Sequence, residues 1–317
     1  MSKIIRIGTR DSELALWQAK TVQQKLNDLG HKTEIVAVKS QGDILLDKPL
    51  YELGITGIFT KTLDIAMLNG QVDIAVHSMK DVPTALPQGI IQAAVLERAS
   101  TLDILVHKGN LEFLHSTGTI ATGSLRRNAE WLHKYPNHQV VDLRGNVNTR
   151  LQKLAENDWN GAVFAAAGLE RLGFIDGKQI KSPSFGGVGE ALDWMIPAPA
   201  QGAMVVVAMA NDNYTIDAVS QLNHIETEIC TYIERQFLKT LEGGCTAPIG
   251  AYATYREEED IIEFKGVLLS IDGKERLTID KKTPLSEWKK LGFNSAQEIL
   301  NNGGAKLMIA IKNQLKK

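Results

Sequence analysis

The first forty residues contain the pattern that most restricts the fold. Lys3–Gly8 has the pattern of a short strand, and Ser12 can cap a following helix whose apolar residues recur at helical spacing as far as Gly30. Glu34–Val38 then has the pattern of a second strand. A strand, a helix and a second strand in this order form a βαβ unit, whose strands are parallel. The chain is therefore expected to contain an α/β domain.

Two further stretches extend the α/β pattern. Gly57–Leu68 is expected to be helical, Asp73–Ser78 to be a buried strand, and Ala203–Ala210 to be an apolar strand that returns to the first domain. A second α/β stretch runs from about residue 102 to 194. Its expected strands, each followed by a helix start, are Thr119–Thr122, Gln139–Leu143 and Ala162–Ala166. Lys181–Gly189 is rich in glycine, so we expect a loop there.

The pattern changes after Asn223. An amphipathic helix ends at Gly243 and Gly244, and three strands near Gly250–Tyr255, Ile261–Ser270 and Glu275–Asp280 precede helices that run to the end. This is the pattern of a small α+β domain. The sequence thus predicts a first α/β domain from residues 1–98 and 199–220, a second from 102–195, and a third, α+β domain from 223–317.

Composition narrows the class of protein. The chain has 317 residues, of which 44% are hydrophobic, so it can bury several cores. Its net charge of −2 does not favour a nucleic-acid or membrane-surface binder. Two cysteines, Cys230 and Cys245, fit a reducing compartment. The first residues lack the pattern of a secretory signal, and no apolar run approaches the roughly 20 residues that span a bilayer. We expect a cytoplasmic protein.

Arginines gather where this α/β pattern predicts strand ends and helix starts. Five of the eleven lie in the second domain: Arg126, Arg127, Arg144, Arg150 and Arg171. Strand ends and first helical turns face one crevice in a parallel sheet, where helix N-termini favour anions and arginine binds carboxylates in a bidentate manner. Arg10 and Ser12 form a similar site after the first strand. The alternative is ordinary surface ion pairing, above all for Arg171, which follows Glu170.

The strand 73–78 leads into a second candidate site. It delivers the hydroxyl of Ser78, the ammonium of Lys80 and the carboxylate of Asp81 to its carboxyl end, where the rigid Pro83 follows. A carboxylate beside a cation stays ionised and can stabilise a developing positive charge. The alternative is a strand end with solvated charges.

The third candidate is Cys245, which follows two glycines at a helix end. Such a loop can approach a ligand closely, and cysteine is otherwise a buried residue, so Cys245 is a candidate nucleophile or attachment point. Cys230 lies on the preceding helix and is expected to be structural. The histidines and cysteines show no zinc-type spacing, and the chain has no P-loop and no dinucleotide fingerprint.

Seven segments in this order resemble the hydroxymethylbilane synthase (porphobilinogen deaminase) family, and together they span nearly the whole chain. The segments are Ile7–Ser12 with Leu14–Gln18, Asp73–Pro83, Thr122–Arg127, Leu143–Leu151, Ala166–Gly173, Gln201–Ala203 and Leu241–Gly250. The resemblance implies two periplasmic-binding-protein-like α/β domains plus a small α+β C-terminal domain. It also implies a monomer that joins four porphobilinogen molecules head to tail, releasing ammonia at each step, to give linear hydroxymethylbilane.

The resemblance assigns roles to residues of this chain. A dipyrromethane primer would be bound by a thioether to Cys245, and Asp81 would stabilise the cation that forms as ammonia leaves. Porphobilinogen carries an acetate and a propionate, which arginines would hold. The cofactor is assigned to Ser78, Lys80, Ser124, Arg126, Arg127 and Arg144. The substrate is assigned to Arg10, Ser12, Arg144, Arg150, Arg171 and Gln201. No metal is implied.

The chain departs from the family pattern at three positions. Thr56 stands where many members have a loop lysine, and Val207 and Met209 replace the usual acidic and basic residues. The main rival function is a solute-binding module for an anionic ligand, which leaves the third domain and the Gly-Gly-Cys loop unexplained. A regulatory ligand-sensing domain is the second rival, and the sequence shows no DNA-binding module to accompany it.

Overall fold

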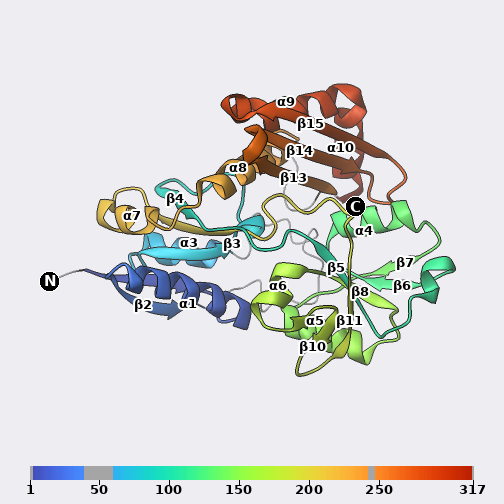
Figure 1. Cartoon of the computed structure of the whole chain (residues 1–317), viewed down its shortest axis with the longest axis horizontal. Helices are drawn as coiled ribbons and strands as arrows, with labels where there is room; N and C mark the ends of the chain where they lie inside the picture. The colour runs from blue at the N-terminus through green and yellow to red at the C-terminus, as the bar shows by residue number, and fades with distance from the viewer. Residues whose placement is uncertain (1–2, 39–59, 242–246, 316–317) are drawn as a thin grey trace. The chain divides into compact units, whose positions relative to one another are not determined.

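The computed structural model describes residues 3–38, 60–241 and 247–315 (Figure 1). The chain forms two compact units. Of the described residues, the first unit contains 3–38, 60–99 and 202–229, and the second contains 100–201, 230–241 and 247–315. One sheet belongs to the first unit and two sheets belong to the second. The expected division into three domains stays a prediction.

The sheet of the first unit has the strand order β2-β1-β3-β12-β4. β1 is parallel to β2 and to β3, whereas β12 lies antiparallel between β3 and β4. The sequence predicts a strand at residues 203–210 that returns to the first domain, but neither its direction nor its neighbours. The strands are β1 Ile4–Thr9, β2 Lys32–Ala37, β3 Ile74–Ser78, β4 Ile90–Val95 and β12 Met204–Met209. The helices are α1 Glu13–Asp28, α3 Lys61–Leu68 and α7 Asn213–Ser220.

The core of this unit explains the opening pattern of the sequence. Ile5 and Ile7 alternate with outward residues on β1 and pack with Val22 and Leu26 of α1, and all four are fully buried. The opening βαβ unit is therefore confirmed. Val207 and Met209 lie on β12, where Val207 is buried between β3 and β4, so a charged residue at 207 would have no solvent there.

The larger sheet of the second unit has the order β7-β6-β8-β5-β11-β10-β9. β7, β6 and β8 are parallel, and the remaining neighbours are antiparallel. The strands are β5 Asp103–His107, β6 Thr119–Ala121, β7 Gln139–Val141, β8 Gly161–Ala165, β9 Ile175–Asp176, β10 Gln179–Lys181 and β11 Gly186–Ala191. The helices are α4 Leu125–Lys134, α5 Val147–Glu156 and α6 Ala166–Arg171.

The prediction that Lys181–Gly189 is a loop holds for residues 182–185 and is wrong for Lys181, which ends β10, and for residues 186–189. β11 begins at Gly186 and pairs with both β10 and β5. A Cβ atom on Gly187 would lie 2.5 Å from the carbonyl oxygen of His107, so a glycine is needed where β11 runs beside β5. The glycines that suggest a loop in the sequence therefore allow close strand pairing in the fold.

The third sheet consists of β13 Ile249–Arg256, β14 Ile261–Leu269 and β15 Arg276–Pro284, all antiparallel (Figure 1). α8 Ile225–Thr240 enters the second unit at Cys230, which is buried as expected. The other helices are α9 Leu291–Ile299 and α10 Ala305–Leu315, with short helical turns at Met79–Asp81, Glu112–His115, Glu257–Glu259, Leu285–Lys290 and Leu300–Gly304. The α/β class with a small C-terminal α+β part is confirmed.

Within the described ranges, no helix has both the length and the apolar character needed to cross a membrane.

Candidate functional site

In the first unit, candidate residues gather where β3 ends. The Ser78 hydroxyl accepts a hydrogen bond from Nε2 of Gln18, which α1 supplies, at 2.9 Å. The backbone N–H of Met79 donates to the carbonyl of Ala203 at 3.0 Å. Two elements thus fix the turn at Met79–Asp81 that carries Lys80 and Asp81.

Asp81 is half-buried at the end of this turn. In the part of the chain that the structure describes, no hydrogen bond or ion pair engages its carboxylate. The group is therefore held by its backbone and leaves its oxygen atoms available to a ligand.

Arg10 and Ser12 follow β1 and are half-buried. Ser12 occupies the N-cap position of α1, but its side chain makes no capping hydrogen bond. His77 is buried on β3, and no described residue forms a hydrogen bond with its Nε2. Burial lowers the pKa of His77 to about 4, and the nearby charge of Arg10 acts in the same direction. His77 is therefore neutral at pH 7, so the basic character of this region comes from its arginine and lysine.

In the second unit, the carboxyl ends of β6 and β7 lie against each other. A Cβ atom on Gly123 would be 2.6 Å from the carbonyl oxygen of Leu143 and 3.5 Å from Cδ of Arg144. Ser124 caps α4 by accepting from the N–H of Arg127 at 3.4 Å, and Asn146 caps α5 by accepting from the N–H of Thr149 at 2.9 Å. Two helix N-termini therefore begin at the same edge of the sheet, as the arginine positions predict.

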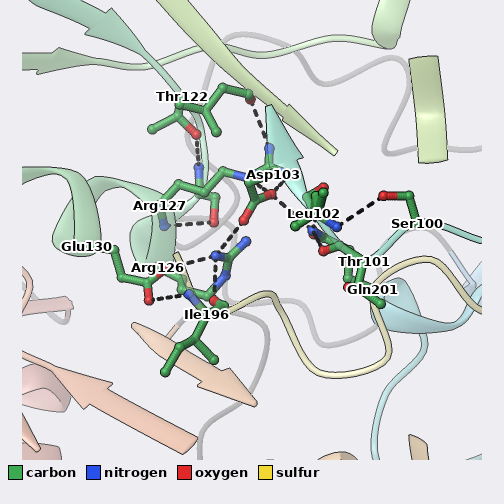
Figure 2. A network of polar contacts seen from close by, with 12 residues as sticks. Ser100, Thr101, Leu102, Asp103, Thr122, Arg126, Arg127, Glu130, Ile196 and Gln201 are labelled. Atoms are coloured by element: carbon green, nitrogen blue, oxygen red, sulfur yellow. Dashed lines mark hydrogen bonds and ion pairs between the residues drawn. The ribbon is translucent and has the colours of Figure 1, made fainter. Parts of the chain in front are cut away.

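Arg126 and Arg127 converge on one buried carboxylate, that of Asp103 (Figure 2). Arg126 Nη1 is 2.8 Å from Oδ2, and Arg127 Nη2 is 2.8 Å from Oδ1. Arg126 Nη1 also pairs with Glu130 at 3.0 Å and donates to the carbonyl of Ile196 at 2.8 Å. Both arginines are buried, so the structure uses them to bind protein groups.

Burial and charge act against each other in this network. Burial alone would raise the pKa of Asp103, but the two guanidinium groups outweigh it and hold that pKa far below its usual range. Burial raises the pKa of Glu130 to about 7, and the attraction of Arg126 offsets only part of that rise. The Asp103 carboxylate is therefore ionised, whereas Glu130 titrates near neutral pH.

Arg144 presents a contrast at the same edge. It is 5% exposed, and its buried Nη1 has no hydrogen-bond partner among the residues that the structure describes. Burial lowers the pKa of Arg144, and the exposed Asp142 counteracts this only in part. A buried guanidinium with an open donor requires an acceptor, and a carboxylate ligand is the acceptor that suits it best.

The remaining predicted residues lie in different surroundings. Arg150 is half-buried on α5, and its Nε donates to the carbonyl of Gly145 at 2.7 Å. Arg171 ends α6, where burial lowers its pKa to about 10 and the charge of Glu170 acts weakly against that effect. Gln201 is fully buried, and its Nε2 donates to Asp103 at 3.0 Å and to the carbonyl of Thr101 at 2.8 Å. Gln201 thus belongs to the Asp103 network.

Sequence reasoning missed Asp103 and Glu130. Glu130 follows Arg126 by four residues on one helix face, a spacing that could have suggested the ion pair. Asp103 opens the apolar strand β5, and nothing near it in the sequence indicates two arginine partners more than twenty residues away. Cys245 and Thr56 lie outside the described residues.

These observations define an α/β protein that gathers arginines and helix N-termini at strand ends, an arrangement suited to a ligand with several carboxylates. Comparison with known proteins makes the class specific. The family model described as "Porphobilinogen deaminase, dipyromethane cofactor binding domain" matches residues 5–217. The model described as "Porphobilinogen deaminase, C-terminal domain" matches residues 228–301.

Two relatives agree over their full length. A porphobilinogen deaminase from Chlorobium phaeobacteroides strain BS1 is 38% identical, with 98% of this chain and 99% of the relative covered. One from Carboxydothermus hydrogenoformans is 39% identical, with 98% of each covered. The chain therefore belongs to the porphobilinogen deaminase family. It is a transferase of tetrapyrrole biosynthesis with a dipyrromethane cofactor, and the solute-binding alternative is not favoured.

Solved structures give much weaker similarity. The methionine-binding protein MetQ is 13% identical with a TM-score of 0.40, covering 69% of this chain and 89% of that protein. A periplasmic substrate-binding protein from Coxiella burnetii is 14% identical with a TM-score of 0.38, covering 69% and 91%. Similarity this low carries no argument about function.

Proposed function

We propose that this chain joins four porphobilinogen molecules head to tail on a dipyrromethane primer, releasing ammonia at each addition and giving linear hydroxymethylbilane. The observation that carries the proposal is Arg144, a buried arginine at the strand-end edge whose Nη1 has no acceptor within residues 3–38, 60–241 and 247–315. Each pyrrole unit carries two carboxylates, so the substrate and the cofactor both supply the missing acceptor.

The carboxylate-binding roles follow from charge and position. Helix N-termini and guanidinium groups at the ends of β6 and β7 favour anions without further rearrangement. We assign the cofactor to Ser78, Lys80, Ser124, Arg126, Arg127 and Arg144. We assign the substrate to Arg10, Ser12, Arg144, Arg150, Arg171 and Gln201. Arg126, Arg127 and Gln201 are held by Asp103, so their contribution depends on that carboxylate.

Asp81 is proposed to be the catalytic residue. Its carboxylate would accept hydrogen bonds from pyrrole N–H groups and offset the positive charge that develops as ammonia leaves. The rigid turn after β3 fixes the position of that charge before substrate arrives. Bound dipyrromethane supplies the pyrrole carbon to which the first unit is added. We assign its covalent attachment to the thiol of Cys245.

We also propose that the protein is a cytoplasmic monomer without nucleic-acid or membrane partners, which its near-neutral net charge supports. Sedimentation velocity of the purified chain, with and without porphobilinogen, tests the monomer.

The experiment that tests the function is an intact-mass measurement of the purified protein. The chain should weigh more than its sequence by one dipyrromethane, and Cys245→Ala should abolish both the added mass and turnover. Cys230→Ala is the matched control, because that thiol is buried on α8, and it should keep the added mass. A fully active protein without added mass would contradict the proposal.

Substitution of Asp81 tests the chemical step. Asp81→Asn keeps the shape but removes the charge, so it should bind porphobilinogen and react more slowly by about 10²–10³-fold or more. Asp81→Glu keeps the charge and should retain part of the activity. Single-turnover rates at saturating porphobilinogen distinguish this role from simple orientation of Lys80. An Asp81→Asn protein that reacts at the wild-type rate would show that the role is wrong.

A further inference from the structure

Three buried carboxylates, those of Asp103, Glu130 and Glu234, bind the segment 196–201, which leads out of the second unit at Gln201. Figure 2 labels two of them, Asp103 and Glu130. Glu130 of α4 accepts from the N–H of Ile196 at 2.9 Å, and Glu234 of α8 accepts from the N–H of Ala200 at 2.6 Å. Asp103 accepts from the Gln201 side chain at 3.0 Å. The carboxylates are 0–3% exposed, and burying a carboxylate is costly unless hydrogen bonds or ion pairs compensate it. The N–H groups of Ile196 and Ala200 and the side chain of Gln201 supply part of that compensation.

The same segment supports the beginning of β13. The carbonyl of Pro197 accepts from the N–H of Ala251 at 2.9 Å. A Cβ atom on Gly250 would lie 2.7 Å from the carbonyl oxygen of Ile196, so the two backbones touch. Glu234 uses its second oxygen atom to accept from the N–H of Ala253 at 2.8 Å. The start of β13 is therefore positioned by residues 196–200 and by α8.

α4 reaches the same C-terminal sheet at a second place. His133 Nδ1 is 2.8 Å from the carbonyl oxygen of Gly273 in the turn between β14 and β15, and Ala129 packs with Val267 and Leu269. α4 thus carries both Arg126 and Glu130 and also contacts the sheet whose first strand begins four residues after Cys245 in the sequence.

We propose that Glu130 is a positioning residue, which aligns β13 with the start of α4, where Arg126 and Arg127 lie. This alignment would set the distance between a group attached just before β13 and the arginines that bind the carboxylates of that group. The inference rests on the proposed function of Cys245. Glu130 uses one oxygen atom for Ile196 and the other for Arg126, so one side chain fixes both partners. Removing its charge leaves Asp103 as the remaining acid on Arg126.

Primer attachment to the cofactor-free chain is the readout. Cofactor-free protein is mixed with porphobilinogen at pH 8, and the gain of dipyrromethane is followed by time-resolved intact-mass measurement. Glu130→Gln should attach the primer roughly 10- to 100-fold more slowly, the effect that a small misplacement of reacting groups produces. Glu130→Asp keeps the charge but is shorter by a methylene, so its rate should fall between those of the wild type and Glu130→Gln.

Two controls separate positioning from general stability. Glu112→Gln makes the same chemical change at an exposed glutamate of the same unit and should attach the primer at the wild-type rate. Val22→Ala destabilises the core of the first unit without touching residues 196–201. Attachment by Glu130→Gln at the wild-type rate, or no slower than by Val22→Ala, overturns the inference. A wild-type chain that never gains the mass overturns the proposed function and this inference with it.

Discussion

The arginines at the start of α4 and the arginine at the end of β7 lie at one edge of the sheet, yet they differ in whether a protein carboxylate binds them. Arg126 and Arg127 are each within 2.8 Å of the buried Asp103 carboxylate. Arg144 is equally buried, and in the described part of the chain its Nη1 has no hydrogen-bond partner. At the start of α4, the protein itself supplies the carboxylate that binds the guanidinium groups. At the end of β7, a carboxylate ligand can provide the acceptor for Arg144. A buried cation without a partner is a more specific sign of a ligand than a cluster of cations.

The largest expected effect comes from removing the charge of Asp103, which binds Arg126 and Arg127 at the start of α4. Asp103→Asn leaves two buried guanidinium groups with one neutral amide between them, so we expect the free energy of unfolding to fall by about 3–5 kcal/mol. Denaturant unfolding measures this loss. Asp142→Asn is the matched control, because Asp142 is an exposed carboxylate beside Arg144 and should change stability by less than about 0.5 kcal/mol. Equal, small losses for both variants would remove the contrast between the two regions.

The sequence predicts the elements that carry the site better than the contacts within it. The βαβ opening, the return of β12 and the strand-end positions of Ser124 and Arg144 follow from local patterns, because periodicity and capping residues act over a few positions. β11 and Asp103 depend on partners far along the chain. Gly187 is needed because the neighbouring strand β5 and the ring of Phe185 leave no room for a Cβ atom there, and Asp103 acquires its arginine partners only when α4 packs against β5.

The second prediction concerns how the contribution of Glu130 to the free energy of unfolding depends on pH. In the folded protein the pKa of Glu130 is about 7, whereas in the unfolded chain it is about 4.5. Between these pH values the folded state therefore binds more protons than the unfolded chain. The stability that Glu130 contributes is fully present below pH 4.5 and is lost as pH rises through 7. The loss amounts to up to about 3 kcal/mol.

The stability of the wild type minus that of Glu130→Gln should therefore decline from pH 4.5 to 7, as measured by denaturant unfolding at several pH values. His77, whose lowered pKa gives the opposite slope between pH 4 and 6.5, is present in both proteins and cancels. The depressed pKa of Asp103 acts in a lower range, because its contribution is present above about 3.8 and is lost as pH falls below that value. A difference that does not vary with pH would refute the raised pKa of Glu130.

The third prediction concerns Arg144 at the end of β7. Arg144→Leu removes a buried guanidinium whose Nη1 has no acceptor among the described residues, so the free energy of unfolding should stay within about 1 kcal/mol or increase. Elongation should stall early, since a charge-assisted contact to a carboxylate contributes roughly 1.5–3 kcal/mol. Native mass spectrometry counts the stalled intermediates, and Arg150→Leu is expected to stall as well. Strong destabilisation with normal elongation would show that Arg144 has a structural partner instead of a ligand.

The smallest effect compares the two helix caps at this edge. The Asn146 cap of α5 is a 2.9 Å hydrogen bond, whereas the Ser124 cap of α4 measures 3.4 Å. Asn146→Ala should therefore cost about 1 kcal/mol of stability and Ser124→Ala about 0.5 kcal/mol, both measured by denaturant unfolding. If the Ser124 hydroxyl also donates to a cofactor carboxylate, Ser124→Ala should slow turnover by more than its stability loss explains, and Asn146→Ala should not. Loss of turnover in proportion to stability in both variants would leave Ser124 with a capping role alone.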